Sequence, residues 1–396
     1  MDITIHPRFL RGEVEVIPSK SQAHRYLICA AFADAPTQFV CPETNRDIEA
    51  TADCLVALGA RILRTDSGYT VFPVSKVPEN AVLPCGESGS TLRFLLPVAG
   101  ALGVDATFQL AGRLPQRPLS PLWEEMERMS CTLTRPTPDT VRCTGKLNSG
   151  RYTIDGGVSS QYITGLLLAL SLLDSPGELV ITGKIESQPY IRMTKDAIVR
   201  FGGDPEHPGV KKLHSPGHLR VEGDWSNGAF FLAANALGSE LTIRGLNQES
   251  PQGDRAIVDI LPRLEVGSPE ISAADIPDLV PILAVTAACK HGAVFRDIRR
   301  LRLKESDRVA SVIAMITALG GKAEAAENTL TVHGTGLTGG TVDAMNDHRI
   351  AMSAAIAATA CRENVTILGA QCVEKSYPKF FAEYARLGGK YEQYLR

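Results

Sequence analysis

Paired cysteines are the first feature that this sequence lacks. Its nine cysteines are an odd number, and no two of them form a Cys-x-x-Cys pair. This spacing disfavours a disulfide framework and a zinc site, and it favours isolated reduced thiols in a cytoplasmic protein. Long apolar runs are also missing. The two most apolar stretches, Ile163–Leu173 and Leu279–Cys289, are both too short to cross a bilayer.

A large excess of charge is absent as well. The chain carries 41 Lys and Arg against 44 Asp and Glu, so its formal net charge is −3. This balance argues against a general nucleic-acid binder and against a protein of anionic membrane surfaces. The first residues, MDITIHPRFL, do not resemble a signal peptide. No stretch is low in complexity, so we expect an ordered chain throughout.

What the sequence does contain is an internal repeat of apolar helices with polar openings. The residues that mark the starts of these segments are Arg25, Arg93, Gln161, Asn227, Asp278 and Arg349. Their spacing is nearly regular, except for one short interval between Asn227 and Asp278. A segment that is apolar on all sides predicts a buried helix. The six predicted buried helices are Ser21–Phe32, Ser90–Leu102, Gln161–Leu173, Ser226–Leu237, Asp278–Cys289 and Asp347–Ala360.

A second set of segments has one apolar face and ends at glycine or another small residue, as helices commonly do. These predicted amphipathic helices are Ala52–Leu58, Pro121–Met129, Lys195–Phe201, Asp254–Leu264, Asp307–Leu319 and Lys379–Leu387. Strand-like segments include Glu178–Thr182, Glu240–Ile243 and Asn364–Leu368. The pattern predicts an α/β protein of six similar repeat units, three in each of two domains.

The polar openings of the predicted buried helices carry unusual numbers of Lys and Arg. A helix N-terminus already has a partial positive charge, so a cation there is unfavourable unless an anion binds beside it. Each motif has an ordinary alternative when taken alone: Ser159 and Asp278 as helix caps, Lys20 and Arg25 as solvated surface cations, and the loop around Arg117 as a surface connection. One hypothesis covers all of them, namely a cleft that binds a substrate with several anionic groups. Asp278 and Glu305 would be its acid–base pair, because an anion site has no need of two extra carboxylates.

Eight motifs in this order resemble the 5-enolpyruvylshikimate-3-phosphate synthase family of enolpyruvyl transferases, over essentially the whole chain. They are PSKSQAHR at 18–25, GESGSTLR at 86–93, RPL at 117–119, SSQ at 159–161, IPD at 276–278, KESDR at 304–308, NDHR at 346–349 and EKSYPKFF at 374–381.

The resemblance implies an inside-out α/β barrel architecture of two similar domains, each built from three βαβαββ units, with the active site in the interdomain cleft. It places residues 18–222 in one domain and residues 1–17 with 223–396 in the other, so that the first strand belongs to the C-terminal half. We read the short interval before Asp278 as the loss of an outer hairpin around 264–275.

The resemblance also implies a reaction. The enolpyruvyl group of phosphoenolpyruvate is transferred to the 5-hydroxyl of shikimate 3-phosphate through a tetrahedral intermediate, and phosphate is released. The reaction belongs to the shikimate pathway, which leads to chorismate and the aromatic amino acids. No metal and no organic cofactor is implied. We expect a cytoplasmic monomer whose partners are these two small anions, with no nucleic acid and no membrane.

The site residues follow by motif position. The resemblance implies Asp278 as the base for the 5-hydroxyl, and Glu305 with Lys20 as the groups that handle the proton at the methylene carbon. The phosphoenolpyruvate contacts it implies are Lys20, Gly89, Arg93, Arg117, Gln161, Arg308, Arg349 and Lys375. The shikimate 3-phosphate contacts it implies are Ser21, Arg25, Ser159, Ser160, Gln161, Ser187, Asp278 and Lys304.

Two positions depart from the family pattern. Glu87 stands where the family usually has Asn, so its carboxylate either repels phosphoenolpyruvate or pairs with Lys20 or Arg117. Arg300 stands where Asn is more usual, near the shikimate position.

Three alternatives share the fold. The UDP-N-acetylglucosamine enolpyruvyl transferases tend to have Lys-Asn in the first motif and a Cys in the flexible loop, but here the motif is Lys20-Ser21 and the loop Ala111–Pro121 has no Cys. A non-catalytic binder of anions or RNA is disfavoured by the presence of both Asp278 and Glu305. The RNA 3′-phosphate cyclases are disfavoured by the motif set.

Overall fold

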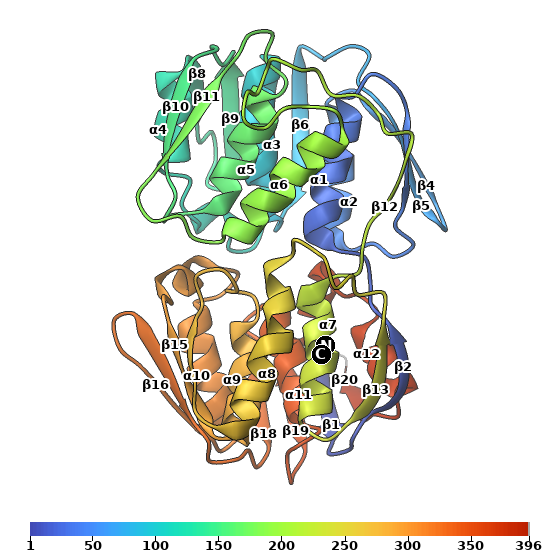
Figure 1. The fold of residues 1–396 in the computed structure, drawn as a ribbon, viewed down its shortest axis with the longest axis vertical. Helices are drawn as coiled ribbons and strands as arrows, with labels where there is room; N and C mark the ends of the chain where they lie inside the picture. Colours follow the sequence, from blue (N-terminus) through green and yellow to red (C-terminus); the bar gives the residue numbers. More distant parts are fainter. Residues whose placement is uncertain (395–396) are drawn as a thin grey trace. The chain divides into compact units, whose positions relative to one another are not determined.

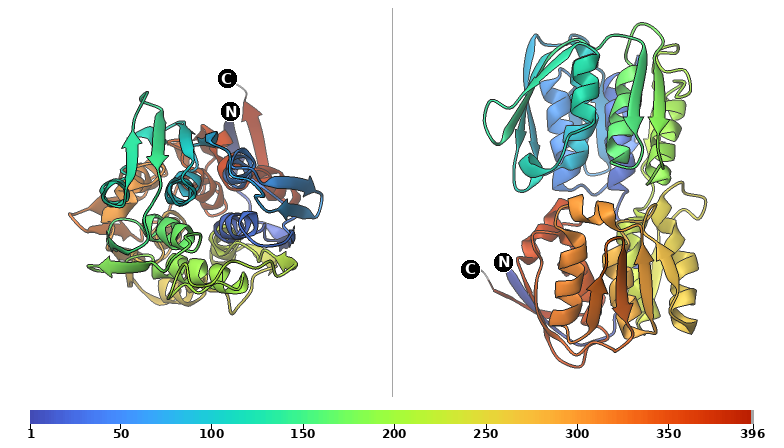
Figure 2. Two further views of the ribbon diagram at one scale, coloured as in Figure 1. Left: turned by 90° about the horizontal axis from the view of Figure 1, so that it is seen from above. Right: turned by 90° about the vertical axis from the view of Figure 1, so that its left-hand side faces the viewer.

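The computed structural model describes residues 1–394, and the chain divides into two compact units. The N-terminal unit is Pro18–Glu222, and the C-terminal unit joins Met1–Ile17 to Gly223–Arg396. Each unit has its own hydrophobic core, built around buried helices with strands outside them (Figures 1 and 2). The predicted α/β architecture is confirmed in both units, and all twelve predicted helices are present.

The N-terminal unit contains three sheets and six α-helices (Figure 1). The helices are α1 (Lys20–Ala31), α2 (Arg46–Ala57), α3 (Gly89–Leu102), α4 (Leu122–Arg128), α5 (Ser160–Leu170) and α6 (Gln188–Arg200). The first sheet has the order β12 (His218–Arg220), β3 (Thr37–Val40), β5 (Gly68–Phe72) and β4 (Arg61–Thr65). The second has β6 (Asn80–Gly86), β7 (Asp105–Leu110), β9 (Thr140–Gly145) and β8 (Cys131–Thr134), and the third pairs only β10 (Arg151–Asp155) with β11 (Glu178–Thr182).

The C-terminal unit follows the same plan. Its helices are α7 (Trp225–Ala236), α8 (Ile257–Val266), α9 (Val280–Cys289), α10 (Arg308–Ala318), α11 (His348–Ala357) and α12 (Phe380–Arg386). One sheet pairs β13 (Glu240–Arg244) with β2 (Arg11–Glu15). The second sheet has the order β14 (Glu270–Ser272), β15 (Gly292–Arg296), β17 (Thr329–His333) and β16 (Lys322–Ala325). The third has the order β18 (Gly340–Asp343), β19 (Val365–Leu368), β1 (Asp2–His6) and β20 (Lys390–Tyr394).

The first strand of the chain completes the last sheet. β1 lies between β19 and β20 and is antiparallel to both, with Ile3 opposite Ile367 on one side and Gln393 on the other. It takes the place that β17 has in the preceding unit, where β17 lies between β15 and β16. The first strand therefore pairs with strands from the C-terminal half of the chain.

Two of the six units lack the outer hairpin of a full βαβαββ unit. In the fourth unit α8 ends at Val266 and the next sheet begins at Glu270, so the hairpin is missing where the short interval predicted its loss. In the third unit α6 leads into residues 201–217, which form no strand. Four glycines and three prolines in that segment disfavour a strand ladder. The sequence spacing did not indicate the missing hairpin of the third unit, because the irregular segment 201–217 keeps the interval between the helix starts close to that of the other units.

Side chains cap the starts of five buried helices and of the amphipathic helix α10. Ser19, Ser88 and Ser159 accept hydrogen bonds from backbone N–H groups at the starts of α1, α3 and α5. In the C-terminal unit Asp224, Asp307 and Asp347 do the same for α7, α10 and α11. Asp278 differs, because α9 begins two residues later and has no side-chain cap. The capping alternative for Asp278 is therefore wrong.

Helices α3 and α5 approach each other closely at Gly165. A Cβ atom built there would lie 2.2 Å from the carbonyl oxygen of Arg93. Any larger residue would force the helices apart. The contact places Arg93 and Gln161, near the starts of the two helices, within hydrogen-bond reach of each other.

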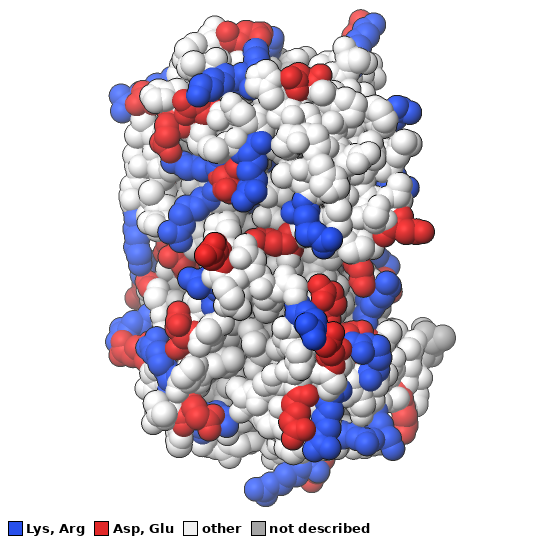
Figure 3. Space-filling view, turned by 45° about the vertical axis from the view of Figure 1, so that its right-hand side comes forward, with Lys and Arg blue, Asp and Glu red and all other residues white. Residues whose placement is uncertain are grey.

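Charges of both signs are interspersed on the molecular surface, as the face in Figure 3 shows. None of the helices within residues 1–394 combines the length and the apolar character that a membrane crossing requires.

We predict that Gly165→Ala lowers the free energy of unfolding by about 1–3 kcal/mol, because the added methyl group overpacks the α3–α5 contact. Urea unfolding followed by circular dichroism measures this change. Gly267→Ala is the matched control, since no atom lies within 4 Å of its Cβ position, and its stability should stay within about 0.5 kcal/mol of the wild type. Equal stability of the two variants would contradict this account of the contact.

Candidate active site

The guanidinium group of Arg308 is the centre of the site residues in the C-terminal unit. The side chain is 1% exposed and donates to three carboxylates: to Asp278 at 2.6 Å, to Glu305 at 2.6 Å and to Asp347 at 2.9 Å. These anions raise the pKa of Arg308 against the opposing effect of burial, which is the largest single influence. A buried guanidinium with three carboxylate partners keeps its charge and fixes its partners in place.

Asp278 binds a second arginine as well. Its other carboxylate oxygen accepts from Arg349 at 3.0 Å, and the ammonium group of Lys304 lies 3.8 Å from the first oxygen. Burial works against the charge of Asp278, yet Arg349, Lys304 and Arg308 together hold the pKa of this carboxyl well below its usual value. Burial lowers the pKa of Lys304 to about 8, although Asp278 opposes the shift. Arg300 is one of the two positions that depart from the family pattern. Its charge also lowers the pKa of Lys304, so it acts on this site.

The segment before α11 is held in an unusual backbone conformation. Met345 and Asn346 have φ angles of 50° and 53°, which non-glycine residues rarely adopt. The carbonyl oxygen of Asn346 accepts a hydrogen bond from the Lys375 ammonium at 2.8 Å. Asp347 follows directly, caps α11 and binds Arg308. Such strain persists where surrounding contacts impose it, and it is common at functional sites.

In the N-terminal unit two guanidinium groups converge on Gly89. A Cβ atom at this glycine would lie 2.7 Å from Nη1 of Arg93 and 2.7 Å from Nη1 of Arg117. Only glycine leaves room for both groups beside the start of α3. Within residues 1–394 the Arg117 side chain makes no hydrogen bond or ion pair, and its Nε is buried without a partner. Two cations at a helix N-terminus form a cradle for a small anion.

Gln161 joins the two helices at this cradle. Its side-chain oxygen accepts from Arg93 at 3.0 Å, and its amide nitrogen donates to Ser90 at 3.0 Å. Ser159 caps α5, accepting from the backbone N–H of Gln161, so the capping function is confirmed. Ser160 is buried in the first turn of the same helix. The structure therefore places Gly89, Arg93, Arg117 and Gln161 together.

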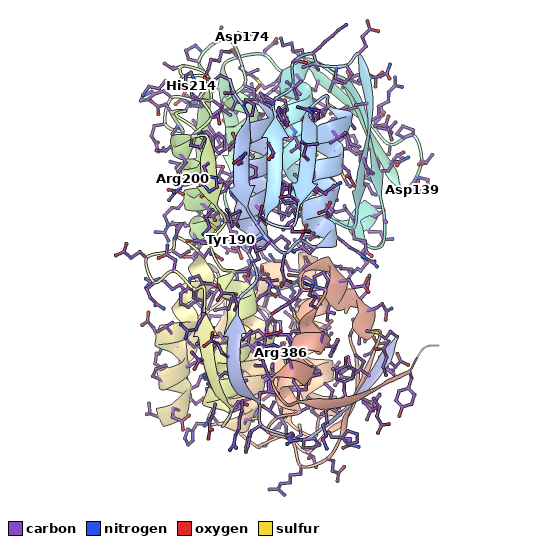
Figure 4. All side chains as sticks on the ribbon, turned by 90° about the vertical axis from the view of Figure 1, so that its right-hand side faces the viewer. Asp139, Asp174, Tyr190, Arg200, His214 and Arg386 are labelled. Carbon is purple, nitrogen blue, oxygen red and sulfur yellow. The ribbon has the colours of Figure 1, made fainter. Side chains whose placement is uncertain are left out.

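Helix α1 positions three more predicted residues. Lys20 opens the helix, and its ammonium donates to Asp47 at 2.9 Å. Arg25 is buried and donates from Nη1 to the carbonyl oxygen of Ser21. It also donates to the hydroxyls of Thr164 and Thr194 and to the carbonyl oxygen of Tyr190, whose side chain is labelled near the start of α6 in Figure 4.

Two further residues have distinctive surroundings. Ser187, directly before α6, is 1% exposed and has a left-handed backbone with φ of 57°.

Glu87 lies against Gly112, at the beginning of the loop that carries Arg117. A side chain at position 112 would collide with the Glu87 carboxylate. Lys20, one of the two pairing partners considered for Glu87, is bound to Asp47.

Sequence reasoning missed three carboxylates that lie near these residues. Asp47 binds Lys20, and Asp347 binds Arg308, yet neither was assigned a function from its motif. Asp254 is buried and accepts a hydrogen bond from Ser226, and burial together with the Asp278 charge raises its pKa to about 7. A local signal existed only for Asp347, which stands directly before an apolar helix. The other two depend on contacts between distant segments.

No group of three or more His, Cys, Asp and Glu side chains that could hold a metal ion occurs among the residues that the structure describes.

We predict that Asp347→Asn destabilises the protein by about 2–4 kcal/mol, because it leaves one side of a buried guanidinium without its anion. Asn still caps a helix well, so the loss reports the ion pair rather than the cap. Asp307→Asn is the matched control. Asp307 caps α10 but is only partly buried, with its ion-pair partner Arg302 at 3.4 Å, and this variant should lose under about 1 kcal/mol. Urea unfolding measures both. A similar loss in the two variants would refute the special role of the Arg308 pair.

The sequence also matches known proteins along nearly its whole length. The family model described as EPSP synthase (3-phosphoshikimate 1-carboxyvinyltransferase) matches residues 6–273 and 265–384. A 3-phosphoshikimate 1-carboxyvinyltransferase from Clostridium kluyveri is 36% identical over 99% of this chain and 98% of its own length. Another from Clostridium beijerinckii is 34% identical over 99% of both chains.

Solved structures show the same fold. An EPSP synthase from Acinetobacter baumannii superposes with a TM-score of 0.79 at 22% identity, covering 99% of this chain and 100% of that one. The enolpyruvyl transferase NikO from Streptomyces tendae superposes with a TM-score of 0.76 at 19% identity, covering 99% of this chain and 98% of that one. Because the family model spans most of the sequence and the two clostridial relatives match over nearly their full length, the chain belongs to the EPSP synthase (3-phosphoshikimate 1-carboxyvinyltransferase) family.

Proposed function

We propose that this protein transfers the enolpyruvyl group of phosphoenolpyruvate to the 5-hydroxyl of shikimate 3-phosphate and releases phosphate. Membership of the EPSP synthase family supports this activity, which belongs to the shikimate pathway to aromatic amino acids. We take residues 18–222 and residues 1–17 with 223–396 as its two domains, and we place it in the cytoplasm as a monomer without metal or cofactor.

The observation that carries the proposal is that Asp278 and Glu305 bind the same guanidinium group, that of Arg308. Carboxylates in an anion site repel the ligand, so a reaction that uses them explains the pair better than anion binding alone. An enolpyruvyl transfer needs both: one group to accept a proton from the attacking hydroxyl and one to exchange a proton with the methylene carbon. The shared position of the two carboxylates at one guanidinium group supports this assignment.

Phosphoenolpyruvate carries a phosphate and a carboxylate, and the cradle around Gly89 suits a small group of that charge. We assign to this substrate Lys20, Gly89, Arg93, Arg117, Gln161, Arg308, Arg349 and Lys375. Shikimate 3-phosphate carries a phosphate, a carboxylate and hydroxyls, which hydroxyl side chains and cations recognise together. We assign to it Ser21, Arg25, Ser159, Ser160, Gln161, Ser187, Asp278 and Lys304.

The proposed reaction has two steps. In the first, the 5-hydroxyl loses its proton to Asp278, its oxygen bonds to C2 of phosphoenolpyruvate, and the methylene carbon gains a proton from Glu305 or Lys20. The product is a tetrahedral ketal. In the second, the methyl carbon returns a proton, the enol ether double bond forms, and the C–O bond to phosphate breaks. Carboxylates stabilise the positive charge that develops at carbon, and the arginines stabilise the departing phosphate.

Phosphate release is the decisive experiment. The purified protein with phosphoenolpyruvate and shikimate 3-phosphate should release one phosphate per enolpyruvyl group transferred. Release with UDP-N-acetylglucosamine in place of shikimate 3-phosphate would identify the related transferase instead. An absence of turnover with both acceptors would favour a non-catalytic anion-binding protein.

We predict that Glu305→Gln lowers kcat by about 100-fold or more, since general acid–base catalysis contributes roughly 10²–10⁴ in rate. The amide keeps the shape of the side chain and can still lie beside Arg308, so KM for both substrates should change little. Steady-state kinetics separate the two parameters, and Glu324→Gln is a suitable control because Glu324 is exposed and binds only His333 among the described residues. An unchanged kcat would remove Glu305 from the chemistry.

A further inference from the structure

A chain of four buried side chains connects helix α1 with the loop before α3. Nδ1 of His24 lies 2.7 Å from the Thr51 hydroxyl, which lies 2.7 Å from the Thr91 hydroxyl. Thr91 in turn donates to the Ser88 hydroxyl at 2.7 Å. His24, Thr51, Thr91 and Ser88 are each no more than 1% exposed. The chain therefore joins α1, α2 and α3 away from solvent.

The direction of this chain follows from proton counting. A hydroxyl group has one proton, and that of Thr91 is donated to Ser88. The bond between Thr51 and Thr91 therefore uses the Thr51 proton. The bond between His24 and Thr51 must then use a proton on Nδ1 of His24, so Nε2 has none. This agrees with its surroundings, because Nε2 is buried without a partner among the described residues and a bare acceptor is tolerated there better than an unpaired N–H.

The histidine is suited to a permanent donor role. Burial, together with the cations of Lys20 and Arg25, keeps its pKa well below the ordinary value, so it stays neutral. Its ring packs edge-on against Phe94, with the ring centroids 6.2 Å apart. The ring is thus held in one orientation by Thr51 on one side and Phe94 on the other.

The far end of the chain is the loop that carries Gly89. Ser88 caps α3, accepting hydrogen bonds from both the hydroxyl and the backbone N–H of Thr91. The next residue, Gly89, lies between the Arg93 and Arg117 guanidinium groups. Thr91 also contacts the carbonyl oxygen of Asp47, whose carboxylate binds Lys20. A displaced Ser88 would move the backbone of the cradle and the partner of Lys20 together.

We propose that His24 is a positioning residue for phosphoenolpyruvate, acting through Thr51, Thr91 and Ser88 to fix the Gly89 cradle. The inference rests on the proposed function, which supplies the substrate. The hydrogen-bond chain from His24 includes no residue that we assign to shikimate 3-phosphate. A change at His24 should therefore alter the binding of phosphoenolpyruvate and leave that of shikimate 3-phosphate nearly unchanged.

The neighbouring residue provides the contrast. Arg25 leaves the same helix toward α5 and α6, where it donates to Thr164 and Thr194, and these two hydroxyls lie 2.8 Å apart. This second network holds a residue that we assign to shikimate 3-phosphate. Adjacent positions on α1 therefore connect to different substrates, which allows each network to serve as the control for the other.

The experiment compares His24→Leu, His24→Asn, Thr51→Val and Thr194→Val. Asn restores a donor near the position of Nδ1, and Val keeps the size of Thr without its hydroxyl. Small misplacements of binding groups have large kinetic effects, so we expect His24→Leu and Thr51→Val to raise KM for phosphoenolpyruvate about tenfold. Their KM for shikimate 3-phosphate should change less than about twofold. Thr194→Val should instead raise KM for shikimate 3-phosphate and leave KM for phosphoenolpyruvate nearly unchanged. His24→Asn should recover most of the wild-type value.

Amide hydrogen exchange provides a second measurement that needs no turnover. Residues 86–92 should exchange faster in His24→Leu and Thr51→Val, and at the wild-type rate in His24→Asn. Equal rises in both KM values, failure of His24→Asn to recover, or unchanged exchange in this loop would each overturn the inference. A wild type without turnover would refute the proposed function instead, and hydrogen exchange with equilibrium dialysis of phosphoenolpyruvate would then decide the role of His24.

Discussion

The need to compensate buried charge governs the polar part of this structure. Arg308 is buried among three carboxylates, and each of them lies beside the start of a helix: Asp278 before α9, Glu305 before α10 and Asp347 before α11. Removing one partner of such a group costs several kcal/mol, while the intact arrangement fixes all of its members. The three helix starts are held together by one guanidinium group, and Arg349 and Lys304 are held beside it through Asp278.

The N-terminal unit meets the same need differently. The side chain of Arg117 has no anionic partner among the described residues, and Arg25 is held by hydroxyl and carbonyl oxygens. The geometry relies instead on close helix packing at Gly165 and on neutral hydrogen bonds such as those of Gln161. A site that leaves positive charge uncompensated binds anions strongly, because the ligand supplies the missing partner. The C-terminal unit thus holds Arg308 and Arg349 with carboxylates, whereas the N-terminal unit holds Arg25 and Arg93 with neutral oxygen atoms.

Much of the fold could be predicted from the sequence because its signals are local. Apolar helices with polar openings, glycine stops and a regular interval indicated the repeat, and the short fourth interval indicated the missing hairpin near α8. The missing hairpin after α6 gave no such signal, because residues 201–217 keep the length of the interval. The capping alternative for Asp278 failed because its two arginine partners come from α10 and α11, 30 and 71 residues away. Contacts such as Lys20–Asp47 and His24–Thr51 were likewise beyond reach, since nothing in either segment alone specifies its partner.

The position of β1 has a consequence for the order in which the protein is made. Residues 18–222 are contiguous, so every element of the N-terminal unit has its partners once that segment has been synthesised. The C-terminal unit cannot complete its last sheet then, because β1 precedes this segment in the chain and its neighbours β19 and β20 follow it. Contacts of such long sequence separation form slowly. The first strand therefore remains without both of its strand partners until β19 and β20 have been synthesised.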